Sequence, residues 1–100
     1  MSSDRSAGLV QDFVEYCRLE KGLASNTLEA YGRDLARLAD FCKGRHREID
    51  EASGADIAAF VDSLYVAGLA SRSVARYLAT LRSYYRYLLE QEQITVDPTT

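Results

Sequence analysis

Residues 68–89 read GLASRSVARYLATLRSYYRYLL, with four arginines and no acidic residue, in a 100-residue chain whose net charge is −3. At the 100° advance per residue of an α-helix, apolar residues collect on one side. They are Val74, Leu78, Leu81, Tyr85 and Leu88. The opposite side is polar, with Arg72, Ser73, Arg76, Thr80 and Ser83. Guanidinium groups pair with phosphates and base edges, so this face suits nucleic acid, although a solvated face on an ordinary bundle helix has the same pattern.

The start of this stretch has a second copy 46 residues earlier in the chain. GLASNTLEAY at 22–31 and GLASRSVARY at 68–77 are identical at five of ten positions, and an apolar segment with helical periodicity precedes each. Each Gly-Leu-Ala-Ser turn is therefore expected to join two helices into a hairpin. Because two units are too few for a solenoid, the sequence predicts two hairpins packed as an all-α, four-helix domain.

The periodicity predicts helices over about 7–21, 25–43, 53–67 and 71–91, joined at 44–52 by a charged connection that Ile49 anchors. Ser25 or Asn26 is expected to cap the second helix, with Asn26 and Glu29 at the spacing of a capping box. Ser71 is expected to cap the fourth helix, and Asp56 lies where a helix dipole favours a carboxylate. The predicted core contains Phe13, Leu35, Phe60, Leu64, Leu78 and Leu81.

Composition narrows the class of protein. With 47% hydrophobic and 27% charged residues the chain resembles a soluble globular domain, and we find no signal peptide and no apolar run of membrane-spanning length. Cys17 and Cys42 are expected to be buried, reduced thiols, which favours a cytoplasmic location. His46 is the single histidine, and no nucleophile has a neighbouring base, so the sequence predicts no catalytic residue, cofactor or metal.

Charge is distributed unevenly along the chain. Residues 48–62 hold five acids and no base, whereas residues 68–89 have a net charge of +4. The acidic sequence pI of about 5.1 argues mildly against a nucleic-acid partner, because such proteins usually carry a basic patch. The distribution of charge matters more than the total, so we expect a strongly polarised molecule.

Two segments together resemble a known family. FVEYCRLEKGLASNTLEAYGRDLARLADFC at 13–42 is similar to the N-terminal domain of tyrosine site-specific recombinases, most of all the bacterial Xer type and related phage integrases. GLASRSVARYLATLRSYYRYLLEQEQITVDPT at 68–99 resembles the last helix of that domain and its exit toward the catalytic domain. Gly32 departs from the family pattern, which commonly has a basic residue there.

The resemblance implies a SAM-like core-binding domain of two crossed helical hairpins, which forms half of a C-shaped clamp on duplex DNA. Its second and fourth helices would lie against the major groove. The implied DNA-binding residues are Asn26, Thr27, Arg33, Arg37, Ser71, Arg72, Ser73, Arg76, Thr80 and Ser83. The implied catalytic residues belong to a C-terminal domain of the full-length chain, and other recombinase subunits would complete a tetrameric synapse.

The resulting prediction is a non-enzymatic DNA-binding domain of a tyrosine recombinase, acting in DNA recombination or integration. Residues 1–8 are expected to be a flexible N-terminus, 9–92 the core-binding domain, and 93–100 the start of a linker. The alternative is a helical protein-interaction module whose basic face binds an acidic partner. A four-helix domain without any ligand would leave the repeated turns and the polarised charge unexplained.

Overall fold

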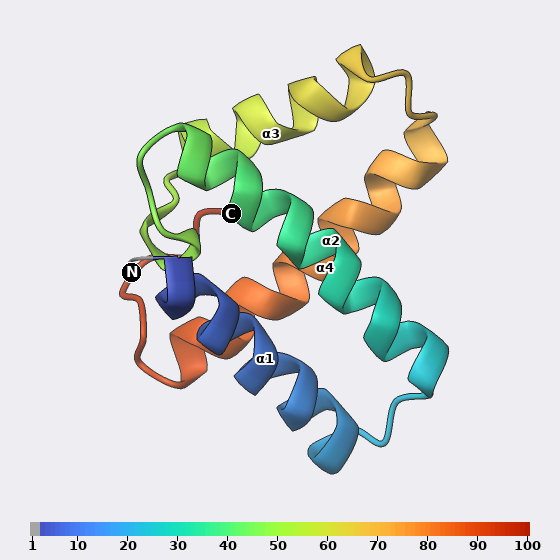
Figure 1. Ribbon diagram of the computed structural model, residues 1–100, viewed down its shortest axis with the longest axis vertical. Helices are drawn as coiled ribbons and strands as arrows, with labels where there is room; N and C mark the ends of the chain where they lie inside the picture. Colours follow the sequence, from blue (N-terminus) through green and yellow to red (C-terminus); the bar gives the residue numbers. More distant parts are fainter. Residues whose placement is uncertain (1–2) are drawn as a thin grey trace. The chain divides into compact units, whose positions relative to one another are not determined.

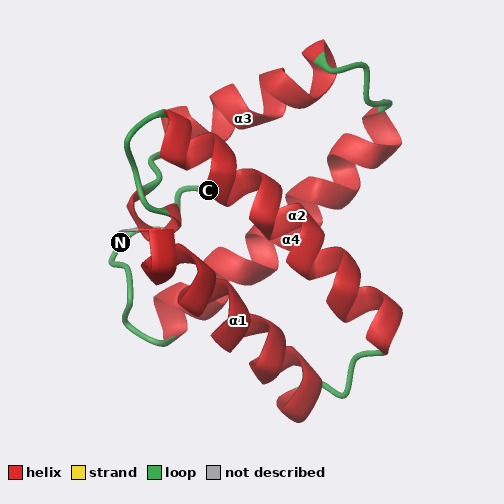
Figure 2. Ribbon diagram, viewed as in Figure 1, coloured by secondary structure: helices red, strands yellow, loops and turns green. Residues whose placement is uncertain are grey.

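The computed structural model describes residues 3–100. Over this range it contains α1 (Ser3–Glu20), α2 (Ser25–Gly44), a 3-10 helix η1 (Ile49–Glu51), α3 (Gly54–Val66) and α4 (Ser71–Glu90), and no strand (Figure 1). Colouring by secondary structure shows the same all-helical composition, with only short connections between the helices (Figure 2). The predicted all-α class with four α-helices is confirmed.

The chain divides into two compact units, each built around one helical hairpin. Unit 1, Met1–Ile49, contains α1 and α2, which lie side by side and run in opposite directions (Figure 1). Unit 2, Asp50–Thr100, contains α3 and α4, which open into a wider V from their connecting turn. Each Gly-Leu-Ala-Ser copy forms the turn of one hairpin, as the repeat predicts.

The first helix begins at Ser3, earlier than the expected start near Ala7, so residues 3–8 are helical. Met1 and Ser2 lie outside the described residues. Ser6 is 7% exposed, and its Oγ accepts a hydrogen bond from the Ile49 N–H at 3.0 Å and donates one to Glu48 Oε1 at 2.8 Å. These bonds tie the first turns of α1 to the segment after α2, a contact that local periodicity does not reveal.

The predicted caps of α2 and α4 are wrong. The N-cap residues are Ala24 and Ala70, both with extended backbone, and neither helix has a side-chain cap hydrogen bond. Ser25 and Ser71 are instead the first helical residues, and Asn26 is the second, so their side chains are not committed to capping.

A complete capping box lies at the start of α3. The Asp56 N–H donates to Ser53 Oγ at 3.2 Å, and the Ser53 N–H donates to Asp56 Oδ2 at 2.9 Å. The sequence places Asp56 correctly at the helix start but does not single out Ser53 as its partner, although the Ser-x-x-Asp spacing is the signal.

Glycine ends α1 and α3, as predicted. Gly22 and Gly68 have φ values of 62° and 93°, in the left-handed region where glycine is favoured. After α3, the Gly68 N–H donates to the Tyr65 carbonyl at 2.9 Å and the Leu69 N–H to the Leu64 carbonyl at 3.1 Å. This pair of bonds is a Schellman motif, which satisfies the last carbonyls of the helix.

The ends of α2 and α4 use the same motif without glycine. His46 and Glu92 take the left-handed conformation, with φ values of 62° and 58°. After α2 the Arg47 N–H donates to the Cys42 carbonyl at 2.9 Å, and after α4 the Gln93 N–H donates to the Leu88 carbonyl at 2.9 Å. A side chain with a Cβ is disfavoured in this conformation, so both turns hold a strained residue.

In unit 1 the buried apolar residues come from one side of α1, one side of α2 and Ile49 of η1, the predicted anchor of the connection. The Phe13 ring stacks on Tyr31 with centroids 5.8 Å apart. The buried apolar set is Phe13, Cys17, Leu35, Leu38, Cys42 and Ile49. Both cysteines are therefore free and buried, as expected, and burial raises the pKa of the Cys17 thiol.

In unit 2 the buried set is rich in aromatic residues. Tyr77 meets Phe60 edge-on at 6.0 Å, and Tyr84 meets Tyr85 edge-on at 5.1 Å. Tyr84 is buried including its hydroxyl, whereas Leu78, a predicted core residue, is only half-buried. The remaining buried apolar residues are Ile57, Leu64, Val74, Leu81 and Leu88.

The segment after α4 folds back onto its own unit. Pro98 is buried, and a Cβ built on Gly54 would lie 3.7 Å from the Pro98 carbonyl oxygen. Asp97 Oδ1 accepts hydrogen bonds from the Thr99 N–H at 2.8 Å and from Thr99 Oγ1 at 2.6 Å. The chain thus ends in an ordered turn next to the start of α3.

Candidate nucleic-acid interface

The outer side of α2 carries the predicted polar residues of unit 1. Asn26, Arg33 and Arg37 are exposed, and Thr27 is half-buried. They face outward because Leu35, Leu38 and Cys42 on the same helix are fully buried and fix its rotation. A row of an amide and two guanidinium groups can donate hydrogen bonds to phosphate oxygens or base edges.

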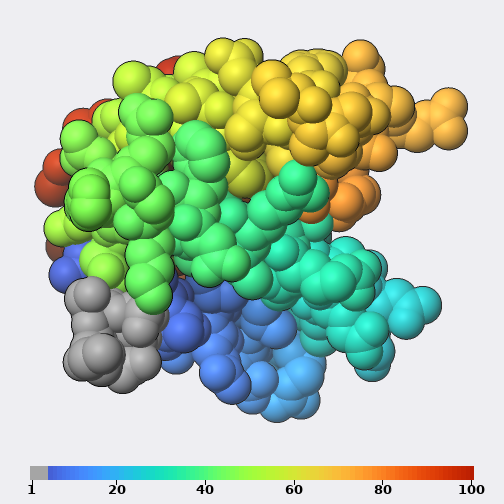
Figure 3. Space-filling model, turned by 45° about the horizontal axis from the view of Figure 1, so that its top comes forward, coloured from blue at the N-terminus to red at the C-terminus, as the bar shows by residue number. Residues whose placement is uncertain are grey.

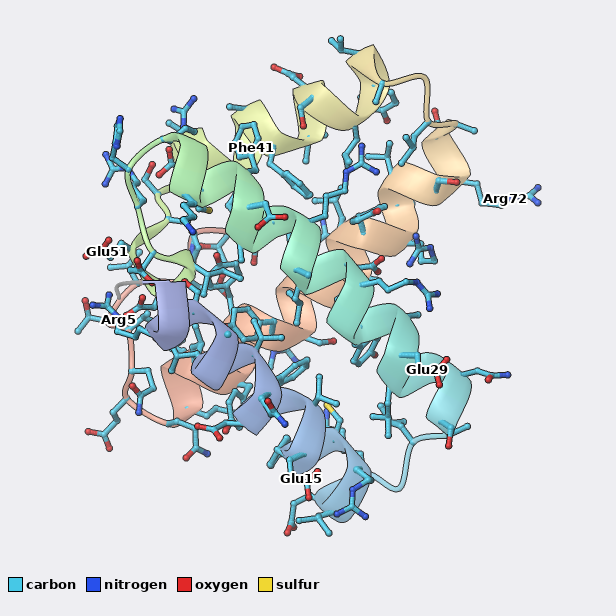
Figure 4. The ribbon with its side chains drawn as sticks, viewed as in Figure 1. Arg5, Glu15, Glu29, Phe41, Glu51 and Arg72 are labelled. Carbon is cyan, nitrogen blue, oxygen red and sulfur yellow. The ribbon has the colours of Figure 1, made fainter. Side chains whose placement is uncertain are left out.

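The outer side of α4 carries the predicted polar residues of unit 2, with one exception. Ser71, Arg72 and Arg76 are exposed, and Ser73 and Ser83 are half-buried. Figure 4 shows the Arg72 side chain extending away from the first turn of α4. The structure therefore brings four of the predicted residues of this helix to its N-terminal turns, namely Ser71, Arg72, Ser73 and Arg76.

Thr80 is the exception. It is 2% exposed, and its hydroxyl donates to the Arg76 carbonyl at 3.3 Å. Thr80 lies roughly 80° around the helix from Arg72, at the border between the polar and apolar sides, and here the core extends further than predicted. Its expected outward position is wrong, and the hydroxyl bonds to the helix's own backbone.

Two further arginines of α4, Arg82 and Arg86, are exposed and lie outside the predicted site. With Arg72 and Arg76 they fall within about 120° of the helix circumference. The exposed alanines Ala75 and Ala79 lie within the same sector. The resemblance to the family does not imply them, whereas the arginine spacing alone would indicate them. We call these four arginines the α4 arginine face.

Charge within unit 2 is concentrated on this helix. The unit contains four bases and seven acids, and all four bases are the arginines of α4. The Arg76 guanidinium lies 4.7 Å from the centroid of the Tyr77 ring, a cation–π contact that restricts its orientation. The α4 arginine face is thus a localised positive surface on an acidic unit.

Unit 1 also has a cavity of about 420 Å³ between α1 and α2. Its walls combine small and apolar residues with a charged rim of Asp40, Lys43, Arg47 and Glu48. The other lining residues are Ser6, Ala7, Val10, Gln11, Val14, Gly32, Ala36 and Ala39. On α2 the lining residues Gly32, Ala36, Ala39, Asp40 and Lys43 follow a row next to that of Arg33 and Arg37.

Neither a metal site nor a membrane-spanning helix occurs among the described residues. No group of three or more histidine, cysteine, aspartate or glutamate residues there could hold a metal ion. None of the described helices combines the length and apolar character needed to cross a membrane. On α1, the Arg18 guanidinium beside Glu15 holds the pKa of that exposed carboxyl below its usual range, in an ordinary surface ion pair.

Two helical hairpins, each with arginines exposed on its second helix, define a small all-α domain of the SAM-like kind. Residues 10–92 match the model of the family described as phage integrase, N-terminal SAM-like domain. The chain belongs to this family, and the resemblance seen in the sequence is confirmed.

The chain is also similar over nearly its whole length to curated relatives. The chain is 36% identical over 97 residues to tyrosine recombinase XerD of Rhizobium meliloti, covering 97% of this chain and 31% of the relative. It is 36% identical over 95 residues to XerD of Agrobacterium fabrum and 37% identical over 93 residues to XerD of Listeria monocytogenes. These alignments cover 95% and 90% of this chain, and 29% and 31% of the relatives. The chain therefore spans less than a third of the relatives' length, and no solved structure matches it significantly.

Proposed function

We propose that this domain binds the recombination site of a XerD-like tyrosine recombinase and presents duplex DNA to a catalytic domain of the same full-length chain. The observation that carries the proposal is the α4 arginine face, which holds every base of an otherwise acidic unit. A folded domain that gathers its cations on one helix favours a polyanionic ligand, and the relatives named recombinases make DNA that ligand.

The two second helices would divide the work of binding. Arg72 and Arg76 lie at the N-terminal turns of α4, the part of a helix that reads bases when it enters the major groove. Arg33 and Arg37 lie further along α2 and are suited to hold phosphates. Breaking and rejoining of strands would belong to the catalytic domain, in a synapse of four recombinase subunits.

Titration of the chain with duplex DNA, followed by amide NMR, tests this function. We expect shifts concentrated on α2 and α4, and weak affinity that falls steeply with salt, because phosphate contacts supply much of the binding free energy. Arg18→Ala is a matched control, since Arg18 is an exposed arginine on α1 that pairs with Glu15. Shifts confined to α1 and α3, or no binding at low salt, would contradict the proposal.

The second candidate is a helical protein-interaction module with a basic face for an acidic partner. The cavity between α1 and α2 favours it, since a concave, largely apolar surface suits a protein side chain or helix. The same titration separates the two functions. An interaction module would show no saturable shifts with duplex DNA on the α4 arginine face.

A further inference from the structure

The end of α2 continues into a dense group of basic residues that the predicted DNA-binding surface does not include. Residues 43–47 read Lys-Gly-Arg-His-Arg, and all five are exposed. No acid occurs between Phe41 and Arg47. We call residues 43–47 the basic turn. Its atoms lie on the surface of the molecule, in green, in Figure 3.

The backbone of the basic turn is fixed rather than loose. The N–H groups of Arg45 and Arg47 both donate to the Cys42 carbonyl at 2.9 Å, and the His46 N–H donates to the Lys43 carbonyl at 3.0 Å. His46 is held at a φ of 62°, a conformation that glycine adopts more readily. Strained backbone of this kind is often kept where the direction of neighbouring side chains matters.

The basic turn also continues the outer row of α2. Arg33, Arg37, Phe41 and Arg45 recur every four residues, which places them along one ridge of the helix. The Arg45 guanidinium lies 5.7 Å from the centroid of the Phe41 ring. Because Arg33, Arg37 and Arg45 are all exposed, the positive charge on the surface of α2 extends past the end of the helix.

We propose that the basic turn is a second binding site for the DNA phosphate backbone, with Arg45 positioned by Phe41 and with Lys43 and Arg47 beside it. This inference rests on the proposed function and extends it. Arg45 lies eight residues after Arg37, about 12 Å further along the helix, so the two arginines cannot hold the same phosphate. Phosphate is the expected ligand because exposed cations attract the charged DNA backbone. The basic turn is not a helix face that could enter a groove and contact base edges.

Stabilisation of the C-terminus of α2 is the alternative role for these cations, and it explains fewer of the observations than phosphate binding does. Positive charge near a helix C-terminus interacts favourably with the helix dipole, and this holds for any basic side chain in the last turn. It does not account for three such residues within one turn. The dipole interaction stabilises the helix, whereas phosphate binding changes the salt dependence of DNA affinity, so the two roles have different measurable consequences.

The test measures affinity for a recombination-site duplex and a random duplex between about 50 and 200 mM salt. For the double variant Arg45→Ala/Arg47→Ala we expect roughly 5- to 30-fold weaker binding to both duplexes, and a slope of log K against log salt that is smaller by about two. Arg45→Lys/Arg47→Lys retains the charge and should keep the slope. Phe41→Leu should weaken binding by roughly two- to fivefold, because it removes the ring contact and retains an apolar side chain.

The outcomes separate this inference from the proposed function. If the double alanine variant binds DNA as tightly as the unmodified chain while Arg76→Ala binds more weakly, the basic turn is not a phosphate site. The domain would then still be a DNA-binding domain. Absence of duplex binding by the unmodified chain overturns both. A loss of slope in the lysine variant equal to that in the alanine variant also overturns the inference, because charge alone should preserve phosphate binding. Arg18→Ala is expected to bind as the unmodified chain does.

Discussion

At the scale of single residues, the left-handed positions decide how each hairpin and each connection turns. Gly22 and Gly68 take positive φ without strain, whereas His46 and Glu92 take it with a side chain. The sequence identifies the first two, because glycine after an apolar helical stripe is a recognised stop. It does not identify the second two, because nothing local distinguishes a histidine or glutamate that must become left-handed.

Replacing His46 with glycine should stabilise the domain. A residue with a Cβ costs about 1 kcal/mol or more in the left-handed conformation, and glycine removes that cost while keeping the Schellman bonds. We expect the free energy of unfolding to rise by about 0.5–1 kcal/mol in urea titrations, less than the full strain because glycine also makes the unfolded chain more flexible. Gly68→Ala, at a φ of 93°, is the mirror-image control and should be destabilising. A loss of stability in His46→Gly would show that the histidine side chain makes a compensating contact.

Gly32 offers a second residue-scale prediction. It lies in the interior of α2, and a Cβ built on it would have no atom within 4 Å apart from the helix's own backbone and chain neighbours. Gly32→Ala should therefore raise the free energy of unfolding by about 0.5–1 kcal/mol, since alanine is the better helix former and meets no clash. Gly22→Ala, at a φ of 62°, should lower it. Thermal unfolding followed by circular dichroism measures both, and equal effects of the two substitutions would contradict the argument.

At the scale of helices, the apolar stripes could be predicted and their edges could not. Phe13, Leu35, Phe60 and Leu64 are buried as predicted, because each lies at the centre of a stripe. Thr80 and Leu78 lie at stripe edges, where a rotation of a few tens of degrees exchanges buried for exposed, and both predictions fail there. The starts of α2, α3 and α4 agree with the prediction to within one residue. The predicted caps of α2 and α4 failed because Ser25 and Ser71 resemble N-caps in the sequence but are the first helical residues.

The cap that does form should be measurable. Ser53→Ala removes the side-chain half of the capping box of α3 and should lower the free energy of unfolding by about 1 kcal/mol, since the Asp56 N–H loses its acceptor. Ser25→Ala and Ser71→Ala are matched controls, because both serines are first helical residues without a cap bond. We expect these two to change stability by only a few tenths of a kcal/mol. A large cost at Ser71 would contradict the assignment of Ala70 as the N-cap.

Removing an arginine from α4 and removing one from α2 should have different effects on DNA binding. In the full-length protein, Arg76→Ala should cost about 1–3 kcal/mol of binding free energy and reduce discrimination between the cognate site and a mutated one. Arg37→Ala should weaken binding to all duplexes alike and reduce the salt slope by about one. Binding isotherms on cognate and random duplexes at several salt concentrations measure both effects. Equal losses on both duplexes for both variants would refute the division between base reading and phosphate holding.

At the scale of the whole molecule, charge arrangement and family membership say more than total charge. Unit 1 contains eight basic and eight acidic residues, and unit 2 contains four basic and seven acidic residues. Composition alone thus argues against DNA, whereas the repeated turns and the arginine spacing indicate the recombinase family that the comparison confirms. The basic turn is not among the predicted binding residues, because it lies where α2 passes into the connection that the sequence describes only as charged.

The acids of unit 2 should act on DNA binding through their long-range field. Asp62, Glu90 and Glu92 are exposed, and the triple variant Asp62→Asn/Glu90→Gln/Glu92→Gln would change the net charge of the unit from −3 to zero. We expect affinity for any duplex to rise roughly two- to tenfold at about 50 mM salt, because the repulsion between these carboxylates and phosphates is lost. The ratio of cognate to random binding should stay the same, since none of the three residues is assigned a base contact.

Salt distinguishes this field effect from new local contacts. At about 0.3 M salt the Debye length is shorter than 8 Å, so the gain in affinity should largely disappear. The charge-conserving variant Asp62→Glu/Glu90→Asp should bind as the unmodified chain does at every salt concentration. A gain in affinity that persists at high salt would mean that the new amides contact DNA directly. No gain at low salt would mean that the acids of unit 2 do not reduce DNA binding at the α4 arginine face.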